Sequence, residues 1–258
     1  MSATKNILIV SKYTFLDLLK SKILILIFLL GFSLLLISYI ASELTYGVPQ
    51  KVSLDFGLGI LTLALVGIAI FMGSNLIVKE IESRTLYMVL SRPVSREVFL
   101  FGKMVGLLEL LALAAFILGV LSVSMFLLLN GVIKATIFQS IFLTFMEATM
   151  VMLLSILFSL LTNSVASVVY TLTLYMTGHM VGELQTFSYV LQNPRLSHFI
   201  KWYGLIFPNF SKLNIKDFVL YETTLPQNYI QNAFLYGVSY SVFLLLVIIT
   251  LFKHKELD

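Results

Sequence analysis

The chain has 258 residues, of which 59% are hydrophobic and only 12% are charged, and its mean hydropathy is +0.99. A soluble domain carries about 25% charged residues, so this composition leaves too little polar surface for a water-facing globule and excludes a soluble enzyme. The net charge is +4 and cysteine is absent, which excludes disulfides, thiolate metal sites and thiol nucleophiles. In a membrane protein the positions of the cations indicate membrane orientation rather than nucleic-acid binding.

Residues 5 to 20 predict an N-terminal amphipathic helix, because apolar side chains gather on one face and mostly charged ones on the other. We expect this helix, within residues 1 to 22, to lie at the membrane interface, partly in the headgroups and partly against protein. The alternative is a basic flank that only sets topology. The apolar run that follows Lys22 is longer than that of a signal peptide and has no clear cleavage site, so an uncleaved span is predicted.

Six apolar runs are long enough to cross a bilayer, whose core of about 30 Å needs roughly 20 helical residues. They are Ile23 to Ser42, Phe56 to Val78, Met104 to Leu129, Ala135 to Leu161, Val165 to Phe187 and Asn232 to Phe252. Unpaired backbone groups are costly in lipid, so each run must be helical, and a single all-α transmembrane domain is predicted. Only Thr162, Asn163 and Ser164 join the fourth and fifth runs, which must be antiparallel neighbours, with Ser164 expected as the helix cap.

The orientation is predicted from Lys and Arg in the short loops, which gather on the cytoplasmic side. With the N-terminus inside, the outer loops hold only Lys51 and Lys134, and the inner side holds eleven cations. These are Lys5, Lys12, Lys20, Lys22, Lys79, Arg84, Arg92, Arg96, Lys103, Lys253 and Lys255. Both termini are therefore predicted to be cytoplasmic.

The segment from residue 188 to 231, before the last span, is rich in aromatic residues and interrupted by Pro194, Pro208 and Pro226. Its apolar stretches are too short to span. Aromatic amphipathic pieces favour the headgroup level, so short interfacial or re-entrant helices are predicted at the extracytoplasmic membrane edge.

The only strongly polar inner loop is residues 79 to 103, between the second and third spans. Glu80 and Arg84 are spaced for an i,i+4 pair on a helix, and Pro93 then disfavours helical geometry at Arg92. Ser95 is suited to cap the next helix. The pattern predicts a short cytosolic helix, a sharp corner and re-entry into the membrane, which suits docking to a cytosolic partner.

This loop resembles that of the ABC type-2 permeases, the membrane subunits of bacterial exporter-type ABC transporters. The resembling residues are Glu80, Glu82, Thr85 and Leu86, then Leu90 to Arg96, then Gly102 and Lys103. The order of features also agrees over nearly the whole chain. The resemblance implies a prokaryotic cytoplasmic membrane, a second copy of this permease or a related one, and two cytosolic ATPase subunits that the loop couples to the spans. The implied coupling residues are Glu80, Glu82, Arg84, Thr85, Leu86, Leu90, Ser91, Arg92, Pro93, Val94, Ser95 and Arg96.

No nucleotide site is expected on this chain. Gly102 and Lys103 lack the upstream glycine and the following Ser or Thr of a phosphate-binding loop. Glu80 and Glu82 point to different helix faces and make a poor acid–base pair. ATP and Mg are therefore expected on the partner ATPase, and no catalytic, cofactor or metal site on this chain.

Four ionisable residues are predicted at membrane depth: Glu109, Glu147, His179 and Glu183. Such groups are costly in hydrocarbon and are functional candidates by default, although each carboxyl is alternatively protonated and hydrogen-bonded between helices. His179 and Glu183 are spaced i,i+4. Two ligands are too few for a closed zinc site, so we interpret them as a proton-binding or gating pair.

The favoured hypothesis is the permease subunit of an ATP-driven exporter that works by alternating access. One alternative is a proton- or ion-coupled secondary transporter that uses Glu109, Glu147 and Glu183. Another is a membrane anchor that transmits ATPase work to an envelope or periplasmic protein through residues 188 to 231. The substrate is not indicated by the sequence, and no nucleic acid is expected as a partner.

Overall fold

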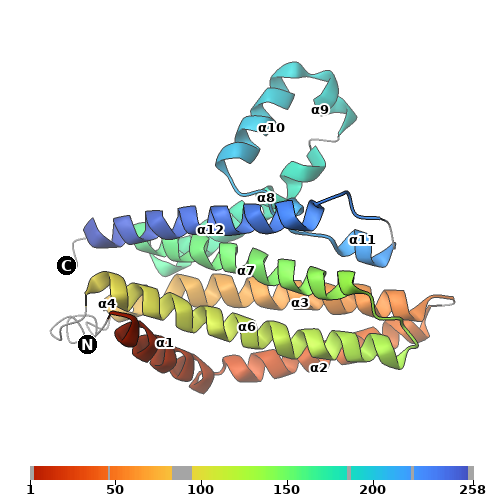
Figure 1. The fold of residues 1–258 in the computed structure, drawn as a ribbon, viewed down its shortest axis with the longest axis horizontal. Helices are drawn as coiled ribbons and strands as arrows, with labels where there is room; N and C mark the ends of the chain where they lie inside the picture. Colours follow the sequence, from red (N-terminus) through yellow and green to blue (C-terminus); the bar gives the residue numbers. More distant parts are fainter. Residues whose placement is uncertain (1–2, 46, 83–94, 185–186, 222–223, 255–258) are drawn as a thin grey trace.

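The computed structural model describes residues 3–45, 47–82, 95–184, 187–221 and 224–254. These residues form helices, turns and loops and contain no strand (Figure 1). The predicted all-α membrane protein is therefore confirmed. The described helices are arranged as a bundle with short connections.

In the part of the chain that the structure describes, five helices are long and apolar enough to cross a membrane. They are α2 (Ile23–Glu43), α3 (Pro49–Asn75), α6 (Arg96–Leu128), α7 (Ala135–Leu161) and α12 (Tyr229–His254), and they lie side by side in Figure 1. They correspond to five of the six predicted runs. Helix α3 begins earlier along the chain than its predicted apolar run, because its polar first turns continue the same helix. Helix α6 also extends beyond the apolar run, to the cap predicted at Ser95.

The predicted fifth run forms helix α8 (Ser164–Leu184), which is not one of those five helices. Its many Thr and Ser residues, with His179 and Glu183, lower its hydropathy. The helix starts beside the end of α3, where Ser164 Oγ donates to Asn75 Oδ1 over 2.7 Å, and it returns along α7. The cap differs from the prediction: Asn163 Oδ1 accepts the Ala166 N–H over 2.8 Å. The six-span topology stays a prediction that this antiparallel course favours.

Both ends of the chain lie at one end of the bundle, together with the start of α6 (Figure 1). There Lys253 of α12 lies 3.6 Å from Glu97 of α6, between Nζ and Oε1. This arrangement fits an even number of crossings. We call this end the inner end, following the cation distribution.

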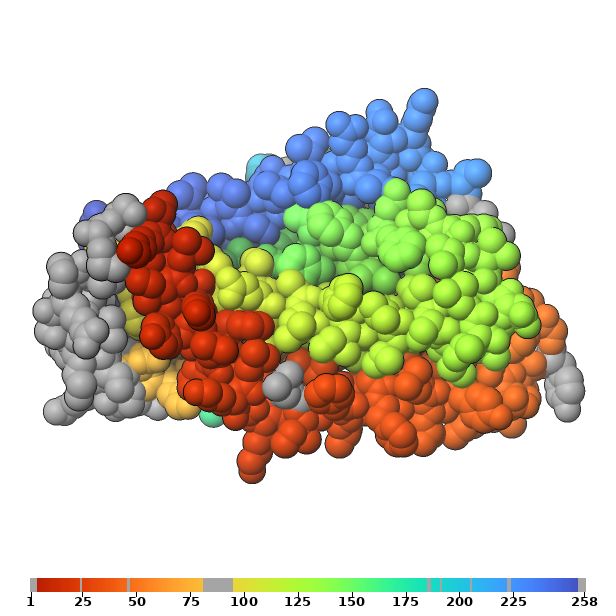
Figure 2. Space-filling model, turned by 60° about the horizontal axis from the view of Figure 1, so that its bottom comes forward, coloured from red at the N-terminus to blue at the C-terminus, as the bar shows by residue number. Residues whose placement is uncertain are grey.

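Helix α1 (Ala3–Lys20) crosses the first turns of α6, and Figure 2 shows it on the surface of the inner end. Two glycines of α6 permit this close approach. A Cβ atom at Gly102 would lie 2.6 Å from Val10 Cβ, and one at Gly106 would lie 2.7 Å from the Ser11 backbone oxygen. The opposite face of α1 exposes Leu8 and other apolar side chains. The predicted N-terminal helix is thus observed with one face against protein.

Helices α3 and α7 form the centre of the bundle, and small residues bring them together. A Cβ atom at Gly73 would lie 3.0 Å from Ser155 Cβ. The Ser155 hydroxyl donates to the Ile70 carbonyl over 2.8 Å, and Ser167 of α8 donates to the Ser155 carbonyl over the same distance. Close backbone packing of this kind replaces the hydrophobic driving force that is missing between helices in lipid.

The predicted short helices before the last span are present. They are α9 (Ser188–Gln192), α10 (Pro194–Ile206), the 3-10 turn η1 (Phe210–Lys212) and α11 (Lys216–Leu220). In Figure 1, α9 and α10 project from the bundle beside α8, whereas α11 lies near the outer ends of α3 and α7. The turn η1 is seated on α8, because a Cβ atom at Gly178 would lie 2.6 Å from the Pro208 carbonyl oxygen.

Candidate functional site

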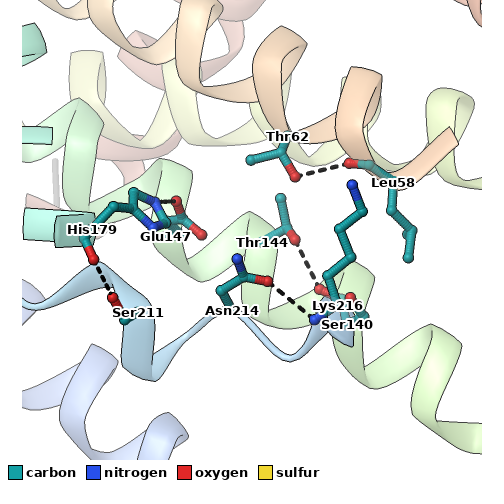
Figure 3. A network of polar contacts seen from close by, with 9 residues as sticks. All are labelled: Leu58, Thr62, Ser140, Thr144, Glu147, His179, Ser211, Asn214 and Lys216. Carbon is teal, nitrogen blue, oxygen red and sulfur yellow. Dashed lines mark hydrogen bonds and ion pairs between the residues drawn. The ribbon is translucent and has the colours of Figure 1, made fainter. Parts of the chain in front are cut away.

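The most enclosed ionisable group that the structure describes in the bundle is Glu147, near the middle of α7, whose side chain is 2% exposed. Its Oε1 lies 2.8 Å from Nε2 of His179 on α8 (Figure 3). Tyr175, one turn before His179, also hydrogen-bonds Glu147 through its side chain. Its ring meets the His179 ring edge-on at a centroid distance of 4.8 Å. Two groups of α8 therefore hold the Glu147 carboxyl of α7.

The structure differs from the predicted pairing of His179 with Glu183. His179 lies on the side of α8 that faces α7, and Phe210 of η1 stacks on its ring at 5.8 Å. Glu183 is exposed. The i,i+4 spacing made a pair within one helix possible, but the packing of α8 and η1 against α7 brings His179 to Glu147 instead.

A pocket of about 300 Å³ adjoins this pair. Its lining comes from three helices and from the segment that follows η1. The residues are Leu58, Gly59, Thr62 and Leu63 of α3, Ser140, Thr144 and Glu147 of α7, Tyr175 and His179 of α8, Asn214 after η1 and Lys216 at the start of α11. Lys216 Nζ lies 2.6 Å from Asp55 Oδ1 of α3. Figure 3 shows most of the polar side chains of this lining, with dashed lines for the hydrogen bonds of Thr62, Thr144, Glu147 and Lys216.

The sequence reasoning identified only Glu147 and His179 of this pocket. The spacing of Ser140, Thr144 and Glu147 along α7 is i, i+4, i+7, which places them on one helix face and was a usable signal. No comparable pattern points to Lys216, because its place depends on how the segment after α10 folds back.

Glu109, the third predicted membrane carboxyl, lies apart from this pocket. Its Oε1 accepts a hydrogen bond from the Ser11 hydroxyl of α1 over 3.4 Å. It therefore takes part in the contact between α1 and α6. Among the described residues, no three His, Asp or Glu side chains are grouped so that they could hold a metal ion.

The predicted coupling segment is described only at its two ends. Helix α4 (Val78–Glu82) carries Glu80, whose Oε1 forms an ion pair with Lys103 Nζ of α6. Ser95 caps α6 as predicted and accepts the Val98 N–H over 3.4 Å, and Arg96 is the first residue of that helix. The other predicted coupling residues after Glu82 lie outside the described residues: Arg84, Thr85, Leu86, Leu90, Ser91, Arg92, Pro93 and Val94.

The comparisons with known proteins place this geometry in a family. A family model described as ABC-2 family transporter protein matches residues 8–257. None of the curated proteins compared with the chain matches it. The family match spans the α1–α6 contact, the coupling segment and the Glu147 pocket, which is almost the whole chain. This chain therefore belongs to the ABC-2 transporter family, as the resemblance of its inner loop predicted.

Proposed function

We propose that this chain is the permease subunit of an ATP-driven exporter, and that a separate ATPase drives it through residues 79 to 103. The observation that carries the proposal is the ion pair between Glu80 and Lys103. It joins the two ends of the segment, 23 positions apart in the chain, and links α4 to the second turn of α6. A force applied to the segment would act on both helices together.

The same end also engages the N-terminal helix. Lys103 lies between Gly102 and Gly106, on which α1 rests, and the Glu97–Lys253 pair adds the end of α12. A displacement of the segment is thus expected to act on α1, α3 and α6 together. The Glu147 pocket lies between α3 on one side and α7 and α8 on the other, so such a movement changes its walls. This is the structural basis that we propose for alternating access.

Under this proposal ATP and Mg bind to the partner ATPase, and this chain supplies the docking surface and the transport path. Two copies of the permease, or one copy and a related chain, pair with two ATPases in a prokaryotic inner membrane.

Charge reversal in the segment tests the proposal. The double variant Arg92→Glu, Arg96→Glu should lower the amount of ATPase that co-purifies by at least about tenfold, because inverted charges oppose an acidic or dipolar docking face. A matched control is Arg195→Glu with Lys201→Glu on α10, which makes the same change of net charge in the segment predicted to lie outside. If both double variants retain wild-type co-purification and ATP-driven transport, the segment is only a connection.

A second candidate function is proton-coupled secondary transport, which the buried Glu147–His179 pair favours. Proteoliposomes distinguish the two. Transport that requires ATP and proceeds without a pH gradient across the membrane supports the exporter. Transport that a pH gradient drives in the absence of any ATPase supports the secondary transporter.

A further inference from the structure

We propose that the Glu147 pocket binds a small organic cation whose ammonium group carries N–H donors. The inference deepens the proposed function and rests on it, since it names the substrate class of the permease. It is drawn from three properties of the pocket: the direction of its hydrogen bonds, its charge and its size.

Two of the hydroxyl groups in the walls face the pocket as acceptors. Thr62 Oγ1 donates its only hydrogen to the Leu58 carbonyl over 2.8 Å, and Thr144 Oγ1 donates to the Ser140 carbonyl over 2.9 Å (Figure 3). A hydroxyl has one donor and two acceptor positions, so both can only accept from a bound molecule. The Glu147 carboxylate is also an acceptor. Asn214 Oδ1 is engaged by the Lys216 N–H over 3.0 Å. The donors of the lining are the Asn214 amide nitrogen, the Ser140 hydroxyl and the Lys216 ammonium group, and its acceptors are Thr62, Thr144 and Glu147.

The charges in the lining leave a negative balance when Glu147 is ionised. Lys216 is a cation, but Asp55 lies 2.6 Å from its ammonium group and neutralises it. A neutral His179 donates one hydrogen bond to Glu147 and adds no charge. One negative charge then remains on a carboxylate that is 2% exposed, where an opposite charge on a ligand is attracted more strongly than in water. An anion would be repelled by the same negative charge.

The volume and the other walls limit the rest of the ligand. A pocket of about 300 Å³ is at the lower end of the usual range for small-molecule sites. Leu58 and Leu63 give it apolar surface, and the rings of Tyr175 and His179 add aromatic surface. A short alkyl or aryl amine fits these walls, whereas a peptide or a lipid does not.

Binding of butylammonium to the purified full chain in lipid nanodiscs tests the proposal by calorimetric titration. Butylammonium should bind, while 1-butanol, which has the same chain without charge, and tetramethylammonium, which has no N–H donor, should bind at least tenfold more weakly. The variant Glu147→Gln should lose at least tenfold in affinity for butylammonium. The variant Glu109→Gln, which neutralises a carboxyl of α6 outside the pocket, should bind as the wild type does.

A second variant keeps the proposal testable if Glu147→Gln does not fold. Thr62→Val with Thr144→Val removes two acceptors at almost unchanged volume and should also lower butylammonium affinity. Unchanged affinity in both pocket variants, or equal binding of 1-butanol, overturns the proposal, and equal binding of tetramethylammonium overturns the requirement for N–H donors.

The two proposals fail separately, because amine binding is measured without the ATPase. If charge reversal of Arg92 and Arg96 leaves ATPase co-purification unchanged while the chain still binds the amine, the role of the coupling segment is refuted and the pocket proposal stands. Normal coupling without amine binding refutes the pocket alone.

Discussion

The α1–α6 contact at the inner end and the Glu147 pocket both join helices that are distant in the chain, but by different means. At the inner end, glycines bring backbones together until no side chain fits between them, as the 2.7 Å from a Cβ at Gly106 to the Ser11 carbonyl oxygen indicates. At the pocket, α7 and α8 meet through the polar groups of Glu147, His179 and Tyr175, and space remains beside them. Lipid supplies no hydrophobic force between helices, so either means must be provided by the sequence.

The difference indicates which part transmits movement and which part responds to it. Contacts between close-packed backbones have few alternative arrangements and move together. A polar pair beside a cavity has alternatives, because either partner can exchange its hydrogen bond with a ligand or with water. We therefore expect the inner end to behave as a rigid unit and the pocket as the place where helices change their relation.

The comparison depends first on topology, where the expected effect is all or none. The chain has no cysteine, so single replacements can be labelled directly. In whole cells Lys51→Cys should react with an impermeant thiol reagent, because it lies in the first turn of α3 at the outer end, and Arg92→Cys should not. Labelling of Arg92→Cys in intact cells would mean that the predicted membrane orientation is reversed.

Removal of His179 should have the largest effect on stability. The variant His179→Leu leaves the Glu147 carboxyl without its ring partner at 2% exposure. Leaving a buried carboxyl short of one hydrogen bond costs about 3 kcal/mol. The double variant with Glu147→Gln should recover part of that loss, since an amide is less costly to bury without a partner than a carboxylate. Unfolding in mixed detergent and SDS measures both, and equal stabilities of the single and double variants would show that the pair is not coupled.

A single methyl group at the α1–α6 contact should have a somewhat smaller effect. Gly106→Ala places a Cβ against a backbone oxygen that cannot rotate away, so we expect a loss of about 1–3 kcal/mol. Gly67→Ala on α3 is the matched control, because nothing lies within 4 Å of its Cβ position. It should be neutral or stabilising by up to about 1 kcal/mol, from helix propensity. Equal results at the two glycines would mean that α1 does not rest on α6.

The smallest effect is expected at the Glu80–Lys103 pair, whose side chains are 23% and 14% exposed. Lys103→Gln should cost no more than about 1 kcal/mol of stability, because partly solvated ion pairs contribute little. ATP-driven transport should fall much more than stability, and Lys103→Arg should restore it. A loss of transport no larger than the loss of folded protein would remove the pair from the coupling path.

The sequence by itself determined the elements that depend on neighbouring residues. Apolar runs of about 20 residues located α2, α3, α6, α7 and α12, and the serine before a polar first turn located the cap at Ser95. The family followed from the residues of one loop, because docking motifs are contiguous in the chain. Helix α8 was found as a helix, but its Thr-rich composition lies near the limit at which hydropathy alone indicates a span.

Only the tertiary structure decided which side chains meet. His179 is 32 positions from Glu147 and four from Glu183, and the rotation of α8 about its own axis selects the distant partner. The same holds for Lys216, which reaches the pocket because η1 folds back onto the glycine face of α8, and for Ser11, which reaches Glu109 because α6 offers a groove at Gly102 and Gly106. Hydropathy and periodicity describe one helix at a time, whereas these contacts depend on how two helices are turned toward each other.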